Sequence, residues 1–220
     1  MEKKAFYRRT LPHFQQPGQA YFVSWNLKDA IPPKALTRYV KKIDELKAQI
    51  VFQKEQKTDK KIIEELETNY YSIRKKYIKA YDDLLNLGEN LTIDLSEQEN
   101  LKIIKEALHF WEGKKLENFA YAVMCNHVHW VFGVYKEDEN KGLVYLQDIM
   151  QSVKRETSNR INKREKRTGP MWQKESFDIT IRDDKHLYYA INYTLQNPVS
   201  AGLVSDWREW PGCWCGCAGF

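Results

Sequence analysis

Residues 117–135, ENFAYAVMCNHVHWVFGVY, contain two stretches with strand character that are separated by a short turn. In the second stretch every second residue from 128 to 134 is Val, Trp, Phe and Val. Successive side chains of a strand point to opposite faces, so these apolar residues share one face while His127 and His129 share the other. The pattern predicts an antiparallel β-hairpin with two chemically different faces.

The residues on both sides of this hairpin predict that it belongs to a larger sheet. Residues 20–27, AYFVSWNL, alternate in the same way, and residues 171–181, MWQKESFDITI, also have extended character. Helical patterns predict three helices. The first opens on a capping box of Ser96 and Glu99 and runs to about Trp111. The second follows an apolar stripe from Leu146 to Ile161, and the third ends at Asn197 before Pro198. This order of elements favours an α+β fold, an antiparallel sheet with helices on its faces.

A long insertion separates the first strand from the rest of this fold. From about residue 35 to 87 the sequence is rich in Lys, Glu, Ile and Tyr at helical spacing, which predicts two long helices packed as a hairpin. A length of 220 residues with 42% hydrophobic residues favours one domain, residues 1–220, that includes this hairpin. The cysteine-rich end, about 211–220, is expected to be an irregular, reduced tail without zinc.

The composition also predicts a compartment. No apolar run approaches the eighteen or so residues that cross a bilayer, and the charged start MEKKAFYRRT lacks the hydrophobic stretch of a secretory signal. Four cysteines, three of them within the last eight residues, do not form a disulfide framework. We therefore expect a cytoplasmic protein without a membrane partner. The sequence carries no signal for an oligomeric state.

The charge of the chain is concentrated in one segment. The formal net charge is +5, and residues 153–175 alone hold eight Lys and Arg against three Glu. A neutral body with one basic stripe is typical of a protein that binds a polyanion, although a charged helix face is often only solvated. The candidate polyanion-binding residues in this stripe are Lys154, Arg155, Arg160, Lys163, Arg164 and Arg167.

His127 and His129 are the first candidate metal ligands. On one face of a strand their Cβ atoms lie roughly 7 Å apart, which lets two ring nitrogens reach one ion. The alternative is that both are half-exposed polar residues on the solvated face of a sheet. Two ligands from one strand leave most of a coordination sphere open, so a metal site needs a third group from another element.

The last predicted helix offers such a group. Tyr193 and Asn197 are one helical turn apart and share a face. An asparagine carbonyl oxygen is a ligand for a hard cation such as Mg²⁺ or Mn²⁺, and a tyrosine beside it has the chemistry to attack a phosphorus atom. The alternative is that Tyr193 only packs as an amphipathic aromatic and that Asn197 only ends the helix.

Three segments carry a specific family resemblance. VMCNHVHWVF, GPMWQKESFDITIRDDKHL and INYTLQNPVSAGLV, in this order and spacing, resemble the motifs of the REP-associated tyrosine transposases, which belong to the wider HUH family of single-strand nucleases. The first segment resembles the His-hydrophobe-His motif, and the third resembles the segment that carries the family's tyrosine. With the N-terminal HFQQPGQAYFVSWNL, the resemblance covers nearly the whole chain apart from the predicted helical hairpin.

The resemblance implies a ferredoxin-like domain that cleaves and rejoins single-stranded DNA near palindromic hairpins. It also makes the six cations of the basic stripe the expected DNA-binding residues. In such an enzyme Tyr193 would attack a phosphodiester, form a 5′-phosphotyrosine and release a 3′-hydroxyl. A divalent cation, Mg²⁺ or Mn²⁺, would be held by His127, His129 and a carbonyl on the tyrosine helix. Related proteins use a glutamine four residues after the tyrosine, where this chain has Asn197. Asn197 is therefore the expected ligand, and Gln196 is the second choice.

The sequence also departs from the family at Cys125, where proline is usual. This change removes no expected ligand, although the nearby thiol is itself a minor candidate. Two other functions fit the same residues. One is a domesticated protein that binds hairpin DNA without cutting it, and the other is a metal-dependent phosphoesterase in which activated water replaces Tyr193.

Overall fold

The computed structural model describes residues 6–8, 12–14, 16–32, 34–57, 59–86 and 92–219. Its contacts divide the chain into two compact units. The first unit consists of residues 1–28 and 90–220, and the second consists of residues 29–89. The prediction of a single domain over 1–220 stays a prediction.

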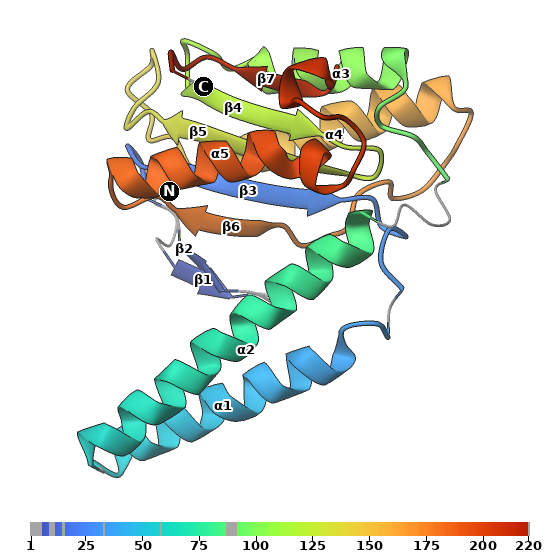
Figure 1. Cartoon of the computed structure of the whole chain (residues 1–220). Helices are drawn as coiled ribbons and strands as arrows, with labels where there is room; N and C mark the ends of the chain where they lie inside the picture. The colour runs from blue at the N-terminus through green and yellow to red at the C-terminus, as the bar shows by residue number, and fades with distance from the viewer. Residues whose placement is uncertain are drawn as a thin grey trace. The chain divides into compact units, whose positions relative to one another are not determined.

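The first unit is built on a five-stranded antiparallel sheet (Figure 1). Its strands are β3 (Ala20–Asn26), β4 (Leu116–Val123), β5 (His127–Val134), β6 (Phe177–Thr180) and β7 (Cys213–Cys215). The spatial order is β6-β3-β5-β4-β7. Two further strands, β1 (Phe6–Arg8) and β2 (Pro12–Phe14), pair with each other in a separate small sheet.

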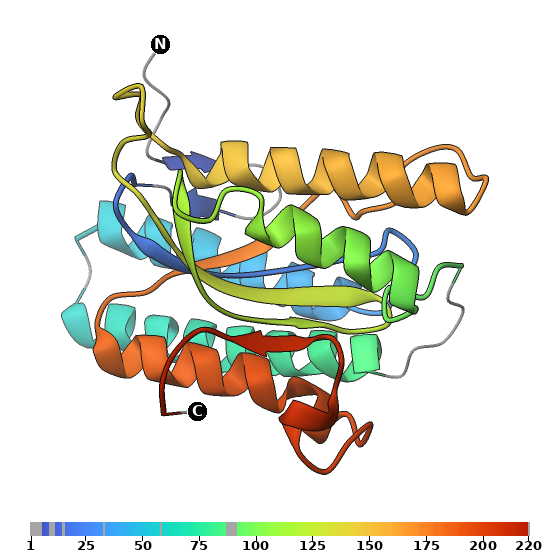
Figure 2. The same cartoon turned by 90° about the horizontal axis from the view of Figure 1, so that it is seen from above.

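Helices cover both faces of this sheet. The helices are α3 (Gln98–His109), α4 (Leu146–Arg164) and α5 (Asp184–Ser200), followed by a short 3₁₀ turn, η1 (Trp207–Glu209). Figure 2 shows α3 and α4 together on one face and α5 on the other. Without the edge strand β7, the chain order β3-α3-β4-β5-α4-β6 and the sheet order β6-β3-β5-β4 are those of a ferredoxin-like fold. The predicted fold class is confirmed.

The sheet has an apolar core on each side. Tyr21, Val23, Trp25 and Trp130 are fully buried on the α3 and α4 face. On the α5 face, Phe22 and Val131 pack with Ile191 and Leu195 of α5. The alternation of β3 and β5 therefore separates two apolar faces rather than an apolar face and a solvated one, which is why both strands are buried along almost their whole length.

The structure corrects two predicted helix ends. α5 continues through Pro198 to Ser200 instead of ending at Asn197. Proline removes only one N–H donor here, and the last turn is closed by bonds from Ala201 N–H to the Asn197 carbonyl and from Leu203 N–H to the Pro198 carbonyl. The capping box predicted for α3 does not form, because Ser96 donates its hydroxyl to Asp94, and Glu97 is the residue that precedes the helix.

The prediction of an irregular cysteine-rich tail is also wrong in part. β7 pairs antiparallel with β4, so that Ala120 is opposite Cys215 and Ala122 is opposite Cys213. Trp214 stacks on Tyr121 with ring centroids 5.5 Å apart and makes an edge contact with His109. The aromatic packing explains why this segment is held at the sheet edge. All four cysteines are free, and Phe220 lies outside the described residues.

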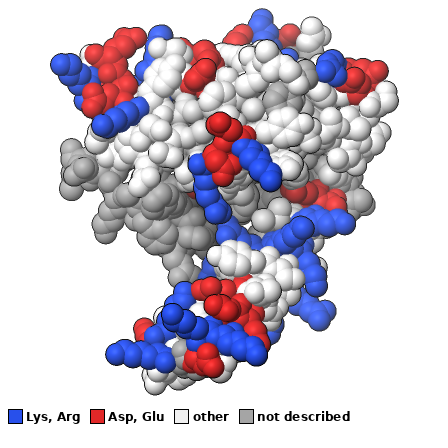
Figure 3. Space-filling model, turned by 60° about the vertical axis from the view of Figure 1, so that its left-hand side comes forward, with Lys and Arg blue, Asp and Glu red and all other residues white. Residues whose placement is uncertain are grey.

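The second unit contains the predicted helical hairpin. Its helices are α1 (Thr37–Glu55) and α2 (Lys60–Asn86), and its expected end at Leu87 lies outside the described residues. Lys54 of α1 forms an ion pair with Glu67 of α2 at 2.7 Å. On this hairpin Lys and Arg side chains are interleaved with Asp and Glu (Figure 3). Among the described residues of the chain, no helix is both long enough and apolar enough to cross a membrane.

Candidate active site

His127 and His129 lie on β5, on the face of the sheet that α5 covers. Their cross-strand partners on β3 are Asn26 and Ser24. Each histidine is only 1% exposed, and their ring centroids are 4.8 Å apart. The alternative of two half-exposed histidines on a solvated face is therefore wrong, because α5 closes over them.

A hydrogen bond sets the orientation of His127. Its Nδ1 lies 2.6 Å from Oδ1 of the buried Asn126. An amide oxygen can only accept, so the imidazole donates from Nδ1 and keeps the lone pair on Nε2. A metal-binding histidine is commonly held in this way by a partner on its second nitrogen. Asn126 was not singled out from the sequence, although its place directly before His127 was visible.

The buried polar atoms around the two histidines lack partners. His127 Nε2, both ring nitrogens of His129 and Asn197 Oδ1 are buried and have no hydrogen-bond partner among the described residues. Leaving such atoms unpaired in a protein interior costs free energy. Two imidazole nitrogens and one amide oxygen together form a donor set that suits a divalent cation. These residues therefore fit the metal that the resemblance implies.

Asn197 is the third member of this group. Asn197 lies on α5 and is 4% exposed. Burial lowers the pKa of His127, and an interaction with the Asn197 side chain offsets part of this effect. Gln196, the second choice, is only partly buried. The structure therefore brings Asn197 close to His127. No group of three His, Cys, Asp or Glu suited to a metal occurs in the described part of the chain, so the amide is essential to this donor set.

Burial controls the protonation of both histidines. Desolvation lowers the pKa of His127 to about 4, and it also lowers the pKa of His129, with a further contribution from His127. Both imidazoles are therefore neutral at pH 7. Neutral imidazole is the form that binds metal, so the site needs no deprotonation step before it can take up a cation.

Tyr193 lies at the open edge of this group. Its ring makes an edge contact with His129 at a centroid distance of 5.5 Å and another with Phe22 at 5.6 Å. Phe22 in turn stacks on His129 at 5.6 Å. Tyr193 is 40% exposed, whereas the histidines and Asn197 are buried. A phenol that solvent can reach thus stands beside a buried set of candidate cation ligands, one helical turn from Asn197.

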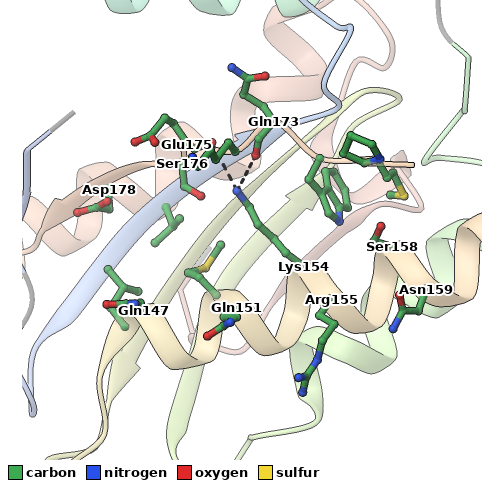
Figure 4. Close-up of a pocket in the computed structure, with 17 residues that line it drawn as sticks. Gln147, Gln151, Lys154, Arg155, Ser158, Asn159, Gln173, Glu175, Ser176 and Asp178 are labelled. Carbon is green, nitrogen blue, oxygen red and sulfur yellow. Dashed lines mark hydrogen bonds between the residues drawn. The ribbon is translucent and has the colours of Figure 1, made fainter. Parts of the chain in front are cut away.

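The predicted DNA-binding residues lie elsewhere. They are on or just after α4, which covers the opposite face of the sheet (Figure 2). Arg160 is paired with Glu106 of α3 at 2.7 Å, and Arg164 is paired with Glu97 and Glu165. Lys154 donates to the carbonyl oxygens of Gln173 and Glu175 (Figure 4). The structure does not bring the six residues to the Tyr193 site. The sequence could not show this, because the pattern of charges along a helix does not say which face of the sheet the helix covers.

Cys125 lies in the turn between β4 and β5. Its carbonyl accepts a hydrogen bond from Leu95 N–H at 2.8 Å, which ties the turn to the segment before α3. Burial raises the pKa of the Cys125 thiol. The thiol is therefore protonated at pH 7 and is a poor metal ligand in this state.

Similarity to a curated protein supports the resemblance seen in the sequence. A protein from Haemophilus influenzae named "Putative REP-associated tyrosine transposase" is 29% identical over 99 residues, which cover 43% of this chain and 56% of the relative. The match thus spans about half the length of that curated relative. A solved structure described as a REP-associated tyrosine transposase bound to a REP hairpin aligns over 97% of this chain and 82% of its own, with 14% identity and a TM-score of 0.46. No protein-family model matches the chain. The chain resembles the REP-associated tyrosine transposases.

Proposed function

We propose that this protein is a metal-dependent single-strand DNA transesterase, a transposase that cleaves and rejoins DNA near palindromic hairpins. One observation carries the proposal: the exposed ring of Tyr193 lies 5.5 Å from the buried ring of His129, which in turn lies 4.8 Å from the ring of His127. His127 also interacts with the buried Asn197, and donor atoms of all three residues have no hydrogen-bond partner among the described residues. A nucleophile beside a cation site is the arrangement that phosphoryl transfer to a side chain requires. The similarity to the Haemophilus influenzae protein supports the same reading.

In the proposed reaction the Tyr193 oxygen forms a bond to the phosphorus of a phosphodiester. The bond between phosphorus and the 3′-oxygen of the preceding nucleotide breaks. The phenol loses its proton and the leaving oxygen gains one, so the products are a 5′-phosphotyrosine and a free 3′-hydroxyl. The new diester keeps the energy of the old one, and a later 3′-hydroxyl reverses the step and joins DNA without ATP.

The remaining residues of the site orient these groups. His127, His129 and Asn197 would hold Mg²⁺ or Mn²⁺, which acts as a Lewis acid on phosphate oxygens when bound. Asn126 fixes the His127 ring so that Nε2 stays available. Phe22 packs against both His129 and Tyr193 and limits the positions of the tyrosine ring. Holding a nucleophile near its target in this way accounts for much of the rate gain in such reactions.

The test uses single-stranded hairpin DNA with unpaired flanks, taken from the flanks of the gene itself, and incubated with the protein and Mn²⁺. A label at the 3′ end should become covalently attached to the protein, whereas a label at the 5′ end should appear on a shorter free strand. The attachment should be lost with EDTA and in Tyr193→Phe. Tyr189→Phe is the matched control, because Tyr189 is an exposed tyrosine one turn earlier on α5.

The other outcomes identify the competing functions. Cutting that persists in Tyr193→Phe, without attachment, would indicate a phosphoesterase that uses water. Binding of the hairpin without any cutting would indicate a DNA-binding protein that has lost the reaction. Either result would overturn the proposed transesterase.

A further inference from the structure

The helix α2 presents one side to α1 and leaves the other side exposed. Figure 1 shows α1 running along α2, and two contacts identify the side of α2 that meets it. Glu67 pairs with Lys54 of α1 at 2.7 Å, and the ring of Tyr70 lies 5.9 Å from Lys47 Nζ. Successive residues of a helix are rotated by about 100°, so these contacts also define the opposite side. The charged residues there are all exposed, and we call them the outer charges of α2: Lys61, Glu64, Glu65, Lys75, Lys79 and Asp83.

The outer charges are poorly compensated within the helix. None of them belongs to an ion pair in the part of the chain that the structure describes. Glu64 and Glu65 are adjacent, and Lys75 and Lys79 are one turn apart, so like charges are grouped and repel each other. Where opposite charges are one turn apart, as in Lys79 and Asp83, the cation comes first, which is the less stabilising order. This grouping weakens an isolated helix and suits a partner with the complementary pattern.

The order of the outer charges becomes its own complement when it is reversed. Along α2 the signs run plus, minus, minus, plus, plus, minus. If a second copy of α2 lies antiparallel against this side, every outer charge meets one of opposite sign. The pairs would be Lys61 with Asp83, Glu64 with Lys79, and Glu65 with Lys75. A parallel copy would place each charge against its own equivalent. The pattern therefore selects one orientation, and a two-fold axis repeats each pair.

An exposed aromatic residue lies at the centre of this arrangement. The midpoints of the three pairs fall at residues 70 to 72 of α2. Tyr71 is 61% exposed, and its ring makes an edge contact with Tyr70 at a centroid distance of 5.3 Å. A tyrosine presents an apolar ring together with a hydroxyl, and this residue type is enriched at the centre of protein interfaces. Tyr71 thus supplies apolar surface between the two groups of charges.

We propose that the outer side of α2 binds the same side of a second copy of this chain, as an antiparallel and two-fold symmetric pair. The outer charges comprise three cations and three anions, so they carry no net charge that would attract the phosphate backbone of a nucleic acid. Ion pairs at exposed positions are individually weak, so the dimer dissociates readily and its affinity falls with salt. The inference does not rest on the reaction proposed for Tyr193.

The first measurement is sedimentation velocity of the full chain, without DNA and in EDTA, over about 1 to 100 μM protein. In about 50 mM NaCl the parent should shift from monomer to dimer within this range. In about 500 mM NaCl it should remain monomeric, because salt screens the pairing of exposed charges.

Charge reversal tests the pairing itself. A basic variant carries Glu64→Lys with Glu65→Lys, and an acidic variant carries Lys75→Glu with Lys79→Glu. Each variant alone places like charges against each other, so its self-association should be at least about 10-fold weaker than that of the parent. An equal mixture of the two variants should form a dimer in low salt, because the basic side of one then meets the acidic side of the other.

The matched control is Arg38→Glu with Lys41→Glu, at two exposed positions of α1. It changes the net charge by as much as the acidic variant does but leaves the outer charges of α2 intact. It should associate as the parent does. Thermal unfolding followed by circular dichroism establishes that each variant is folded.

Each other result overturns the inference. A parent that stays monomeric in low salt has no such interface. Charge-reversal variants that associate like the parent place the interface on another surface. A mixture that stays monomeric shows that the outer charges do not pair with each other. If a double variant unfolds, Tyr71→Ala decides instead: it should weaken the dimer by about 10-fold, and an unchanged affinity counts against the proposed interface.

Discussion

At the scale of single residues, a few buried polar atoms form the candidate active site. His127 and His129 are placed by strand alternation, but the bond from His127 to Asn126 determines which nitrogen is available. Asn197 supplies an oxygen from a different element. Because none of these atoms has another described partner, the site is costly for the fold unless something binds there. That cost is expected where a structure is shaped by function rather than by stability alone.

Replacing Asn197 by Ala should weaken Mn²⁺ binding by at least about 10-fold, because it removes one of the three donor atoms. Isothermal titration of the metal-free protein with Mn²⁺ measures this directly. Gln196→Ala is the matched control, since Gln196 is adjacent on the same helix but only partly buried. A loss of Mn²⁺ binding only in Gln196→Ala would show that Gln196 is the ligand. Equal losses in the two variants would mean that Asn197 has no particular role in binding the ion.

The metal-free protein should lose stability as the pH falls from about 6.5 to about 4. In the unfolded chain a histidine has a pKa near 6.5, whereas burial lowers the pKa of His127 to about 4 in the fold. Between these values the unfolded state binds a proton that the native state does not, so the free energy of unfolding falls, by on the order of 3 kcal/mol for this residue. Urea unfolding in EDTA at pH 7.5, 6 and 4.5 measures it.

His127→Gln provides the comparison for this pH dependence. The variant should show a smaller fall over the same pH range, because it lacks one of the two buried imidazoles. His129 should account for part of the fall that remains, since its pKa is also lowered by burial. Identical pH profiles for the variant and the parent would mean that His127 is not buried in its neutral form.

At the scale of elements, β7 extends the ferredoxin-like sheet by one edge strand. Gly212 precedes it and lies against the last residue of β4, where its carbonyl accepts from Val123 N–H at 3.0 Å. Trp210 Nε1 donates to the Val123 carbonyl at 2.9 Å. A Cβ on residue 212 would lie 2.1 Å from that carbonyl oxygen and 2.5 Å from Trp210 Nε1. Only glycine at position 212 allows the backbone before β7 to approach the end of β4 this closely.

Gly212→Ala should therefore destabilise the protein by about 1–3 kcal/mol, because β7 must move away from β4 and the Trp210 bond must lengthen. Urea unfolding at neutral pH measures the change. Ala218→Ser, at an exposed position in the same tail, should have little effect. An unchanged free energy of unfolding in Gly212→Ala would mean that β7 contributes nothing to the stability of the sheet.

The sequence predicted most elements because their periodicity is local. The strands β3, β4 and β5 and the stripe of α4 follow directly from side-chain spacing, and so does the one-turn relation of Tyr193 to Asn197. What spacing does not encode is the face on which each helix packs. For that reason the burial of both histidines under α5, and the separation of α4 from Tyr193, became visible only in the fold. β7 was missed because three residues are too short to carry a periodic signal.

At the scale of the whole molecule, the candidate active site is built only from residues of the first unit. His127, His129, Asn197 and Tyr193 all belong to it. The hairpin of α1 and α2 is a compact unit of its own and contains none of these residues. The helical hairpin is one continuous segment that contains none of the candidate site residues, so it can be removed without removing any of them.

Replacing residues 34–89 by a flexible Gly/Ser linker should leave a folded first unit that binds Mn²⁺ with the affinity of the full chain. The reason is that all the donor atoms and the strand and helix that position them remain. Calorimetry with Mn²⁺ and the covalent-attachment assay measure the two properties separately. Loss of cooperative unfolding would show that the first unit depends on the hairpin for its fold. Retained Mn²⁺ binding with weakened attachment of DNA would instead assign the hairpin, with its interleaved Lys and Glu residues, to DNA binding.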